Sequence, residues 1–372
     1  MPFRWYTIAR RDDLGTAKVW KYDKLTQGAL SALVAIVEAQ NGASYNLDNP
    51  VYENVKEFSL IAGAYNFWNL PGPLARAQSV FNGDNIQETN WSEQADGWQW
   101  DKFIMQFGDY FGDPDHYVSL GDAKNPIINL DWDEAKVRAA GATGYLSDSG
   151  RLNIYALIDT DMTGRAPGGF RRLRKIDDWT SLGSGEHDVT IDVDFPVRTV
   201  YLRSKKNDSG PDEGISQVKL SFDSDKFVPI DEYTEEAMRR NVHEFNLPNS
   251  FGNRVMAKHD IDLHAPLGYI QSMAIEPHGG ANRFHYVNYL IPCTSRIAYY
   301  DSSGVAITTY ETALAQWNGF VPYSTVAWRW GGPFAKVSEL PANRYLKGSF
   351  KCTQAEASHA VTVGLEQIAV QP

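Results

Sequence analysis

Three short segments of this chain carry residue types that bind metal ions. They are residues 259–264 (HDIDLH), 159–164 (DTDMTG) and 112–117 (GDPDHY). In an extended chain His259 and His264 would point to opposite faces, because side chains alternate along a strand. The segment 159–164 begins like a calcium loop but lacks the later ligands and the closing glutamate. We therefore interpret all three segments as solvated turns or strand edges and expect no bound metal.

No pattern typical of an activated nucleophile or a phosphate-binding loop is present. The chain lacks GxSxG, HExxH, a Walker loop and a strand-linked GxGxxG. Its carboxylates are numerous enough for a glycosidase pair, but sequence spacing does not show that two of them face each other. Its 11 tryptophans are dispersed, which is typical of core and interface residues. We therefore expect no enzyme activity and no cofactor.

The composition limits the class of protein. The 372 residues suffice for two domains, and 43% hydrophobic residues suffice to fill two cores. A net charge of −11 and a pI near 5.2 argue against wrapping of nucleic acid, and we expect no sequence-specific nucleic-acid binding. The two cysteines are too few for a disulfide framework. A secretory signal pattern is absent, and the longest apolar stretch, residues 30–37, is far shorter than the roughly 20 residues that span a bilayer.

The elements that must position any functional residue are mostly strands. Residues 189–195 alternate apolar and polar side chains, residues 218–223 do so again, and residues 200–202 carry a strand between them. Turn-forming residues and no helix connect these segments, which predicts antiparallel sheet. Residues 231–245 then predict an amphipathic helix with Asp231 as its N-cap.

Strand patterns recur on both sides of residues 159–169, a linker rich in glycine and proline. Residues 29–39 fit helix or strand equally well, and residues 74–81 fit a short helix. Further strands are predicted at 128–132, 151–158, 284–291, 296–300, 305–309, 325–330, 345–352 and 360–370. In the last, Val361, Val363 and Leu365 alternate with Thr362, Gly364 and Glu366. The chain has no fixed repeat of 20–50 residues, so we predict two tandem β-sandwiches with a few short helices.

The N-terminal residues 1–28 differ from the rest in charge. They contain six basic and three acidic residues, so they carry +3 within an acidic chain, and aromatic residues lie among them. One interpretation is a strand or coil that packs on the first domain. The other is an arm that contacts anionic lipid or a neighbouring subunit. The candidate contact residues are Arg4, Trp5, Arg10, Arg11 and Lys18.

The order of these features resembles one known family. In the first half the similarity lies in residues 35–42 (AIVEAQNG), 55–83, 125–136 and 145–158. In the second half it lies in residues 197–206 (VRTVYLRSKK), 215–241 and 357–370. Together these segments cover nearly the whole chain, and their pattern and order resemble the double jelly-roll major capsid proteins of tailless icosahedral bacteriophages, typically those with an internal membrane.

The resemblance implies an all-β fold of two eight-stranded jelly rolls, with an arm at 1–28, a first jelly roll at 29–165 and a second at 166–372. It implies no catalytic residues. The partners would be two further copies in a homotrimer, neighbouring capsomers, penton or vertex proteins, and the internal membrane. The protein would be made in the host cytoplasm and reside in the virion shell. The alternatives are a minor vertex or spike protein, or a β-sandwich carbohydrate-binding module or glycosidase.

Overall fold

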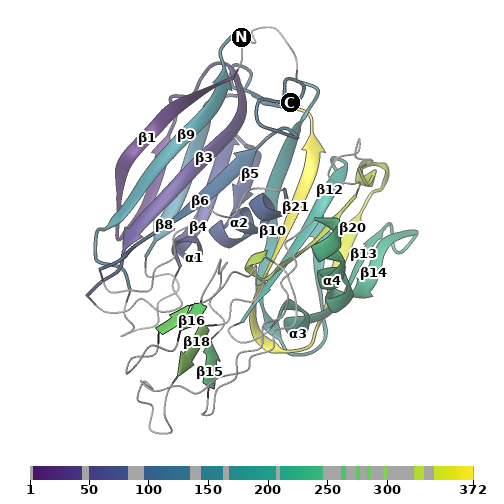
Figure 1. The fold of residues 1–372 in the computed structure, drawn as a ribbon. Coiled ribbons are helices and arrows are strands. Elements are labelled where there is room, and N and C mark those ends of the chain that lie inside the picture. The colour runs from purple at the N-terminus through teal and green to yellow at the C-terminus, as the bar shows by residue number, and fades with distance from the viewer. Residues whose placement is uncertain are drawn as a thin grey trace.

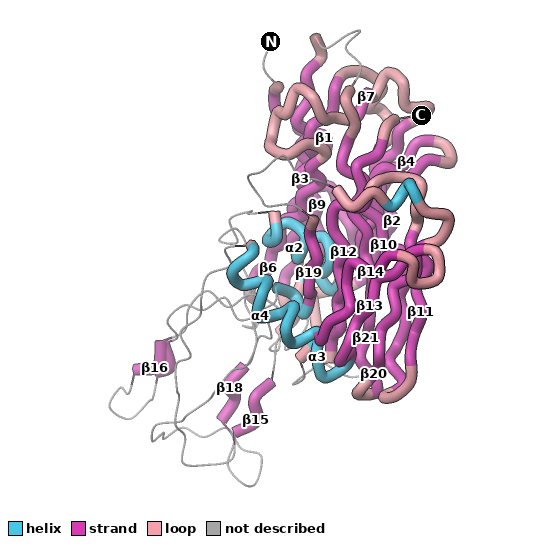
Figure 2. The backbone as a smooth tube through the Cα atoms, turned by 90° about the vertical axis from the view of Figure 1, so that its right-hand side faces the viewer, coloured by secondary structure: helices cyan, strands magenta, loops and turns pink. Residues whose placement is uncertain are grey.

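The computed structural model describes residues 3–43, 50–82, 96–134, 144–161, 167–206, 210–245, 322–330 and 339–371, and the backbone of four short strands between 261 and 299. Strands dominate this part of the chain, and its helices are short (Figures 1 and 2). In both views β1 begins and β21 ends near the same end of the molecule. Among the described residues, no helix is long and apolar enough to cross a membrane.

Eight main strands and two helices make up the first half of the chain. They are β1 (Arg4–Gly15), β2 (Ala17–Tyr22), β3 (Ala29–Gln40), α1 (Val51–Asn54), β4 (Val55–Ala62), β5 (Tyr65–Leu70), α2 (Gly72–Phe81), β6 (Trp98–Gln106), β8 (Pro126–Asp133) and β9 (Gly150–Asp159). A two-residue strand, β7 (Val118–Ser119), pairs with β3. One sheet has the order β1-β9-β3-β6, and β5-β4-β8-β2 form one side of a larger sheet.

The second half repeats this composition. Its main elements are β10 (Phe170–Leu182), β11 (Glu186–Ile191), β12 (Val197–Lys205), α3 (Pro211–Gly214), β13 (Ile215–Phe222), β14 (Phe227–Tyr233), α4 (Thr234–Glu244), β19 (Thr325–Arg329), β20 (Gly348–Gln354) and β21 (Ala357–Ala369). The short strands β15 (Ile261–His264), β16 (Ala274–Glu276), β17 (Arg283–His285) and β18 (Arg296–Tyr299) form two separate pairs. The sheet orders are β19-β12-β21-β10 and β11-β20-β13-β14.

Both halves have the same topology. When the eight main strands of each half are counted along the chain, one sheet has the order 1-8-3-6 and the other 2-7-4-5, which is the order of a jelly roll. The helices α1 and α2 follow the third and fifth strands, and so do α3 and α4. Corresponding helices also pack on corresponding strands: α2 contacts β4 and β6, and α4 contacts β13 and β19. The chain is therefore a structural duplication that no short sequence repeat revealed.

The side-chain pattern explains why these segments are strands. In β3, which fitted helix or strand by sequence, residues 34, 36, 38 and 40 are half-buried and the residues between them are buried. That period of two is typical of a strand. The sheet β11-β20-β13-β14 carries the row Asp188, Lys351, Lys219 and Asp231 across its four strands. The two outer pairs of this row, Asp188 with Lys351 and Lys219 with Asp231, join opposite charges, which stabilises them, whereas the central lysines are of like charge.

The two jelly rolls have separate cores but share one sheet. One apolar cluster lies mainly in the first half and a second lies in the second half. However, β10 pairs in parallel with β5, through Leu173 with Trp68 and Arg174 with Asn69, which joins eight strands into one sheet. Phe170 and Tyr201 of the second half pack into the first core. The sequence predicted two sandwiches but not this continuity.

Apart from the hairpins β4–β5 and β13–β14, the main strands that follow one another in sequence are not neighbours in space. The segments predicted around residues 189, 200 and 218 are β11, β12 and β13. We expected these strands to be linked by turns alone, but α3 lies between β12 and β13. β12 belongs to the eight-stranded sheet, whereas β20 separates β11 from β13. A jelly roll sends all successive strands except the fourth and fifth to opposite sheets, and period-two patterns do not reveal this order.

The N-terminal residues are part of the first jelly roll. Residues 4–22 form β1 and β2, which pair with β9 and β8, so the predicted boundary at residue 29 is wrong and the jelly roll begins at Arg4. Both are edge strands, where charged side chains are tolerated because much of the strand faces water. The predicted linker 159–169 lies between β9 and β10, and its residues 162–166 are outside the described part.

Both predicted helices are present, but each begins at a different residue from the one predicted. The predicted helix at 74–81 is α2, which begins at Gly72. The helix predicted at 231–245 begins only at Thr234, because β14 continues to Tyr233. Asp231 is therefore not an N-cap but a strand residue opposite Lys219. The strand predicted at 305–309 lies outside the described residues.

Candidate functional site

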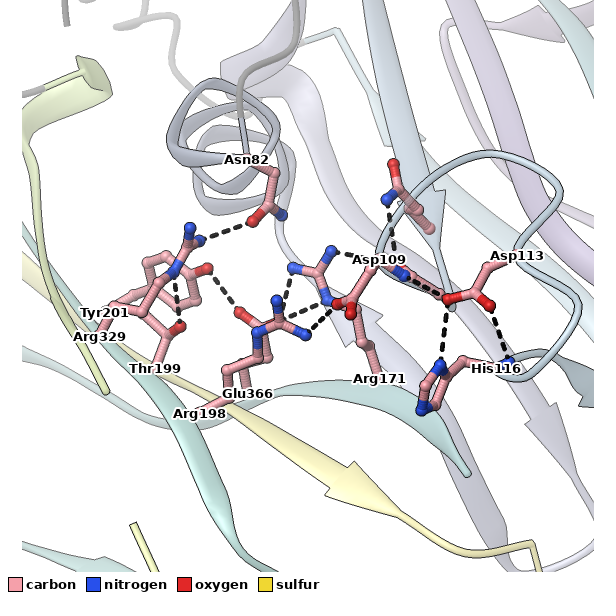
Figure 3. Close-up of polar contacts among 12 residues, drawn as sticks. Asn82, Asp109, Asp113, His116, Arg171, Arg198, Thr199, Tyr201, Arg329 and Glu366 are labelled. Carbon is pink, nitrogen blue, oxygen red and sulfur yellow. Dashed lines mark hydrogen bonds and ion pairs between the residues drawn. The ribbon is translucent and has the colours of Figure 1, made fainter. Parts of the chain in front are cut away.

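Charged side chains buried where the two jelly rolls meet form the candidate functional site (Figure 3). At its centre is Glu366 of β21, which is fully buried. Arg171 Nε donates a hydrogen bond to Glu366 Oε1 at 2.5 Å, and Tyr201 Oη donates to Oε2 at 2.8 Å. Arg198 Nε lies 3.8 Å from Oε1. Strands β10, β12 and β21 thus converge on one carboxylate.

The arginines keep this carboxylate ionised. Burial by itself raises the pKa of Glu366, but the guanidinium groups of Arg171, Arg198 and Arg329 outweigh that effect and lower the pKa to about 2. Burial and the nearby Glu366 charge raise the pKa of Tyr201, so its hydroxyl remains a hydrogen-bond donor. The cluster is therefore a fixed arrangement of charges with no group poised for proton transfer near neutral pH.

The same arginines reach the first jelly roll. Arg198 Nη1 donates to Asp109 Oδ1 at 2.5 Å, and Arg171 Nη1 donates to the carbonyl oxygen of Gly108 at 3.4 Å. Arg329 Nη2 donates to Asn82 Oδ1 at 2.6 Å. Gly108 and Asp109 follow β6, and Asn82 follows α2. These hydrogen bonds therefore fix the second jelly roll against the helix and loop of the first.

A second buried cluster links the halves through α1 and α2. Arg203 of β12 forms an ion pair with Glu53 of α1. Arg76 Nε lies 2.8 Å from Asp101 Oδ1 and donates to Tyr323 Oη at 3.2 Å. All these side chains except that of Tyr323 are charged, and all are buried. Separation of the halves would leave charges without partners in an apolar setting, which is energetically costly.

One group at the edge of the cluster has the composition of a metal site. Ligand atoms of Asp109, Asp113 and His116 lie within 4.8 Å of one another. Asp113, however, already accepts hydrogen bonds from the backbone N–H groups of Asp109 (3.0 Å) and Asp115 (2.9 Å), and it lies 3.0 Å from His116 Nδ1. Burial raises the pKa of Asp113, but the two backbone N–H groups and His116 together lower it further than burial raises it. Asp109 pairs with Arg198. These contacts fit a role in organising the loop.

The other two segments with metal-binding residue types behave differently. The backbone N–H of Asp161 donates to Asp159 Oδ1 at 2.9 Å, as in an ordinary turn. Residues 261–264 form β15, which pairs with β18. His259 and Asp260 lie outside the described residues.

The structure places the predicted contact residues on the molecular surface, outside the buried charge cluster. Arg4, Trp5, Arg10 and Arg11 are exposed on β1, and Lys18 is exposed on β2. Trp5 is 50% exposed and packs edge-on against Phe111 at 5.8 Å between ring centroids. Lys18 Nζ donates to the carbonyl oxygen of Asp13 at 2.7 Å. These residues follow two edge strands and do not form one cluster.

Sequence reasoning missed the central carboxylate. The alternation in residues 360–370 placed Glu366 on a polar, solvent-facing side, whereas that side of β21 is covered by the first jelly roll. A signal was present in the basic cluster at 171–175, because several arginines in one strand require acidic partners if they are buried. The partner itself is 195 residues away from Arg171 in sequence.

Comparison with known proteins identifies the fold. No protein-family model and no curated protein matches the chain. The structure of the major capsid protein of Sulfolobus turreted icosahedral virus matches with a TM-score of 0.55 and 7% identity, covering 99% of this chain and 97% of that chain. A chain from the atomic structure of that virus gives a TM-score of 0.57 at 9% identity, covering 100% and 92%. A chain of the PBCV-1 virus capsid gives 0.53 at 8% identity, covering 98% and 93%. The chain therefore has the double jelly-roll fold of viral major capsid proteins.

Proposed function

We propose that this chain is the major capsid protein of an icosahedral virus and that three copies form one capsomer in the virion shell. The observation that carries this proposal is the end-to-end structural correspondence. The capsid chains match 98–100% of this chain, so the similarity extends over both jelly rolls and over the way in which they are joined. A single β-sandwich, such as a carbohydrate-binding module, would match only one half.

The buried charges support a mechanical role. A subunit that tiles a closed surface must keep its two halves in a fixed relation, because errors in angle accumulate around the shell. Glu366 and Glu53 are each paired with arginine across or beside the seam. Breaking buried pairs of this kind costs several kcal/mol. We propose a structural protein without catalytic activity and without a required cofactor.

The predicted partners of the N-terminal residues were lipid and a neighbouring subunit. A strand rises about 3.3 Å per residue, so the 12 residues of β1 extend roughly 36 Å. Arg4 and Trp5 lie at its beginning, Arg10 and Arg11 lie further along, and Lys18 lies on the next strand. A flat lipid surface across one end would contact only part of this set. The placement therefore favours a neighbouring copy, and we propose that partner.

The test is the mass and shape of the purified protein. One chain has a mass of 41.7 kDa, so a trimer has about three times that value. We expect native mass spectrometry to give the trimer and negative-stain microscopy to show particles with three-fold symmetry and a pseudo-hexagonal outline. A monomer at micromolar concentration would contradict the proposal. In purified virions the chain should be the most abundant band on a stained gel, whereas a vertex or spike protein would be a minor band.

A further inference from the structure

The internal duplication allows the two jelly rolls to be aligned residue by residue at their first strands. In β1 the pairing register with β9 shifts at Ile8, and in β10 the register with β21 shifts at Ile176. Both isoleucines are partly buried and pack against the core of their own half. Aligned at these positions, residues 3–8 (FRWYTI) correspond to residues 171–176 (RRLRKI).

Inside the chain, this first strand forms the seam between the jelly rolls. The first strand of the second half, β10, pairs in parallel with the fifth strand of the first half, β5. Arg172 Nε donates to the carbonyl oxygen of Asn66 at 3.0 Å, and its guanidinium lies 4.8 Å from the Tyr65 ring centroid. The seam therefore uses an arginine of the first strand to bind the backbone of the fifth.

The helix after the fifth strand completes the seam. α2 lies on the outer face of the sheet β19-β12-β21-β10. A Cβ added to Gly364 would lie 2.6 Å from Leu74 Cδ2, so the helix packs directly on the backbone of β21. The rings of Phe81 and Tyr201 are 6.0 Å apart. α2 is buried along its whole length.

At the corresponding edges at the two ends of the duplication, no further strand is paired within the described part of the chain. β1 is an edge strand of its sheet, and β14, the fifth strand of the second half, is an edge strand of another. In Figure 1 they lie on opposite sides of the molecule. Both edges expose large apolar side chains: Trp5 is 50% exposed, Tyr6 39%, Val228 36% and Tyr233 58%. Exposed apolar side chains on unpaired edge strands mark sites of association.

The two edges carry side chains of opposite charge, although α4 also exposes Arg239 and Arg240. β1 presents Arg4 and Arg10, and Arg4 aligns with Arg172 of the internal seam. Asp231 is exposed on β14, and Glu235 and Glu236 are exposed in the first turn of α4. Opposite charges on facing surfaces favour the correct pairing and the rate of association.

We propose that β1 of one copy pairs in parallel with β14 of a second copy, and that α4 of the second copy covers the outer face of the sheet β1-β9-β3-β6. This inference rests on the proposed function in that it requires copies of this chain to associate. Each contact between chains then repeats the seam inside the chain. Because the two surfaces differ, the contact is heterologous, and in the proposed trimer three such contacts close a ring of six jelly rolls.

The internal seam also predicts the register in which β1 of one copy pairs with β14 of the next. Asn69 pairs with Arg174, and Asn69 lies three residues before the first residue of α2. Asp231 lies three residues before Thr234, the first residue of α4. Tyr6 aligns with Arg174, so Tyr6 of one copy should lie opposite Asp231 of the next. Paired strand residues are close enough for a disulfide.

Cysteine crosslinking tests this register. We expect the double variant Tyr6→Cys with Asp231→Cys, treated with a mild oxidant, to form linked dimers and trimers on a non-reducing gel, with no larger species. The matched control is Tyr6→Cys with Asp188→Cys, because Asp188 is exposed on β11 at the other edge of the same sheet. The wild-type protein gives the background from its own two cysteines.

The outcomes separate this inference from the proposed function. Trimers by native mass together with crosslinking of the control pair and not of the test pair would overturn the inference and leave the capsid function standing. A protein that remains monomeric overturns both. If the double variant fails to fold, hydrogen exchange of the wild-type trimer tests the pairing instead. Peptides covering β1 and β14 should exchange at least tenfold more slowly in the trimer than in diluted monomer. Two other edge strands, β2 and β11, should be unchanged. Equal protection of β1, β14, β2 and β11 would contradict the pairing.

Discussion

Glu366 is the residue on which the junction of the two jelly rolls depends. It accepts hydrogen bonds from Arg171 and Tyr201, and Arg171 and Arg198 extend to the loop after β6. A buried ion pair often adds little net stability compared with apolar residues, but removal of one member leaves the other charge buried and uncompensated. The main effect of the cluster is therefore to fix one relative arrangement of the two halves.

Neutralising this carboxylate should therefore be strongly destabilising. For Glu366→Gln we expect the free energy of unfolding to fall by about 3 kcal/mol, because the guanidinium of Arg171 stays buried without an ionic partner. Chemical denaturation followed by tryptophan fluorescence measures this. Glu186→Gln, on the exposed edge strand β11, is the matched control and should change stability by less than about 0.5 kcal/mol. Equal effects of the two substitutions would show that the cluster does not hold the halves together.

The low pKa of Glu366 predicts an acid dependence. The pKa is about 2 in the folded chain and about 4.3 in an unfolded one. A lowered pKa contributes stability that is fully present above the unfolded value and is lost as the pH falls toward the folded value. Wild-type stability should therefore decrease between about pH 4.3 and pH 2 by roughly 3 kcal/mol from this group alone.

The measurement is the free energy of unfolding at several pH values, compared with that of Glu366→Gln. Other carboxylates titrate in both proteins, so the difference between the two curves isolates Glu366. The difference in the free energy of unfolding between the wild-type protein and Glu366→Gln should become smaller as the pH is lowered from 5 toward 2. A constant difference over that interval would mean that Glu366 has the same pKa in the folded and the unfolded chain, which would contradict the lowered value.

At the scale of single elements, α4 stabilises the edge strand β19. Asn241 of α4 is buried, and its side chain forms two hydrogen bonds with the backbone of Ala327. Asn241 Nδ2 donates to the Ala327 carbonyl oxygen at 2.7 Å, and Asn241 Oδ1 accepts from the Ala327 N–H at 2.8 Å. An edge strand needs such partners because no further strand satisfies its outer backbone groups.

Loss of this side chain should weaken the second jelly roll. Asn241→Ala leaves a buried donor and a buried acceptor without partners, and we expect a loss of about 2–4 kcal/mol in the free energy of unfolding. Arg239→Ala on the exposed face of the same helix removes only a surface ion pair with Glu235 and should cost less than about 0.5 kcal/mol. Thermal unfolding of both variants checks this. A loss for Asn241→Ala no larger than that for Arg239→Ala would show that the contact contributes no stability.

At the scale of the whole molecule, the two jelly rolls are joined more closely than two domains on a flexible linker. They share an eight-stranded sheet, and Phe170, Leu173, Tyr201, Ala327 and Ala369 of the second half belong to the first apolar cluster. Elements that complete one another's core unfold together. The chain should therefore behave as one cooperative unit despite its duplicated topology.

This predicts that the first half does not fold alone. A fragment of residues 1–166 lacks β10 and the residues of the second half that cover α2, so its apolar surface would be exposed. We expect the fragment to give poorly dispersed amide resonances and rapid proteolysis, whereas the full chain resists protease. A fragment with a sharp unfolding transition and dispersed resonances would show that the jelly rolls are independent.

The sequence alone was sufficient to predict the all-β class, most strands and the two-part organisation. The period-two patterns that became β8, β9, β13 and β21 are local properties of the chain, because side-chain alternation depends only on neighbouring residues. The double jelly-roll resemblance likewise came from the order of such patterns. The sequence analysis did not predict the buried cluster around Glu366, because the acidic partner of Arg171 lies 195 residues away along the chain.

The tertiary structure alone decided which strands are neighbours and which polar residues are buried. β1 became a strand of the first jelly roll because β9 offers it a free edge, and that partner lies more than 130 residues away in sequence. Glu366 and Asp231 also show that the sequence pattern does not determine which residues are buried. Each occupies a polar position in an alternating strand, yet Glu366 is buried by the first jelly roll, while Asp231 is exposed on an open edge. Alternation separates two faces of a strand, but only packing between distant segments determines which of them water reaches.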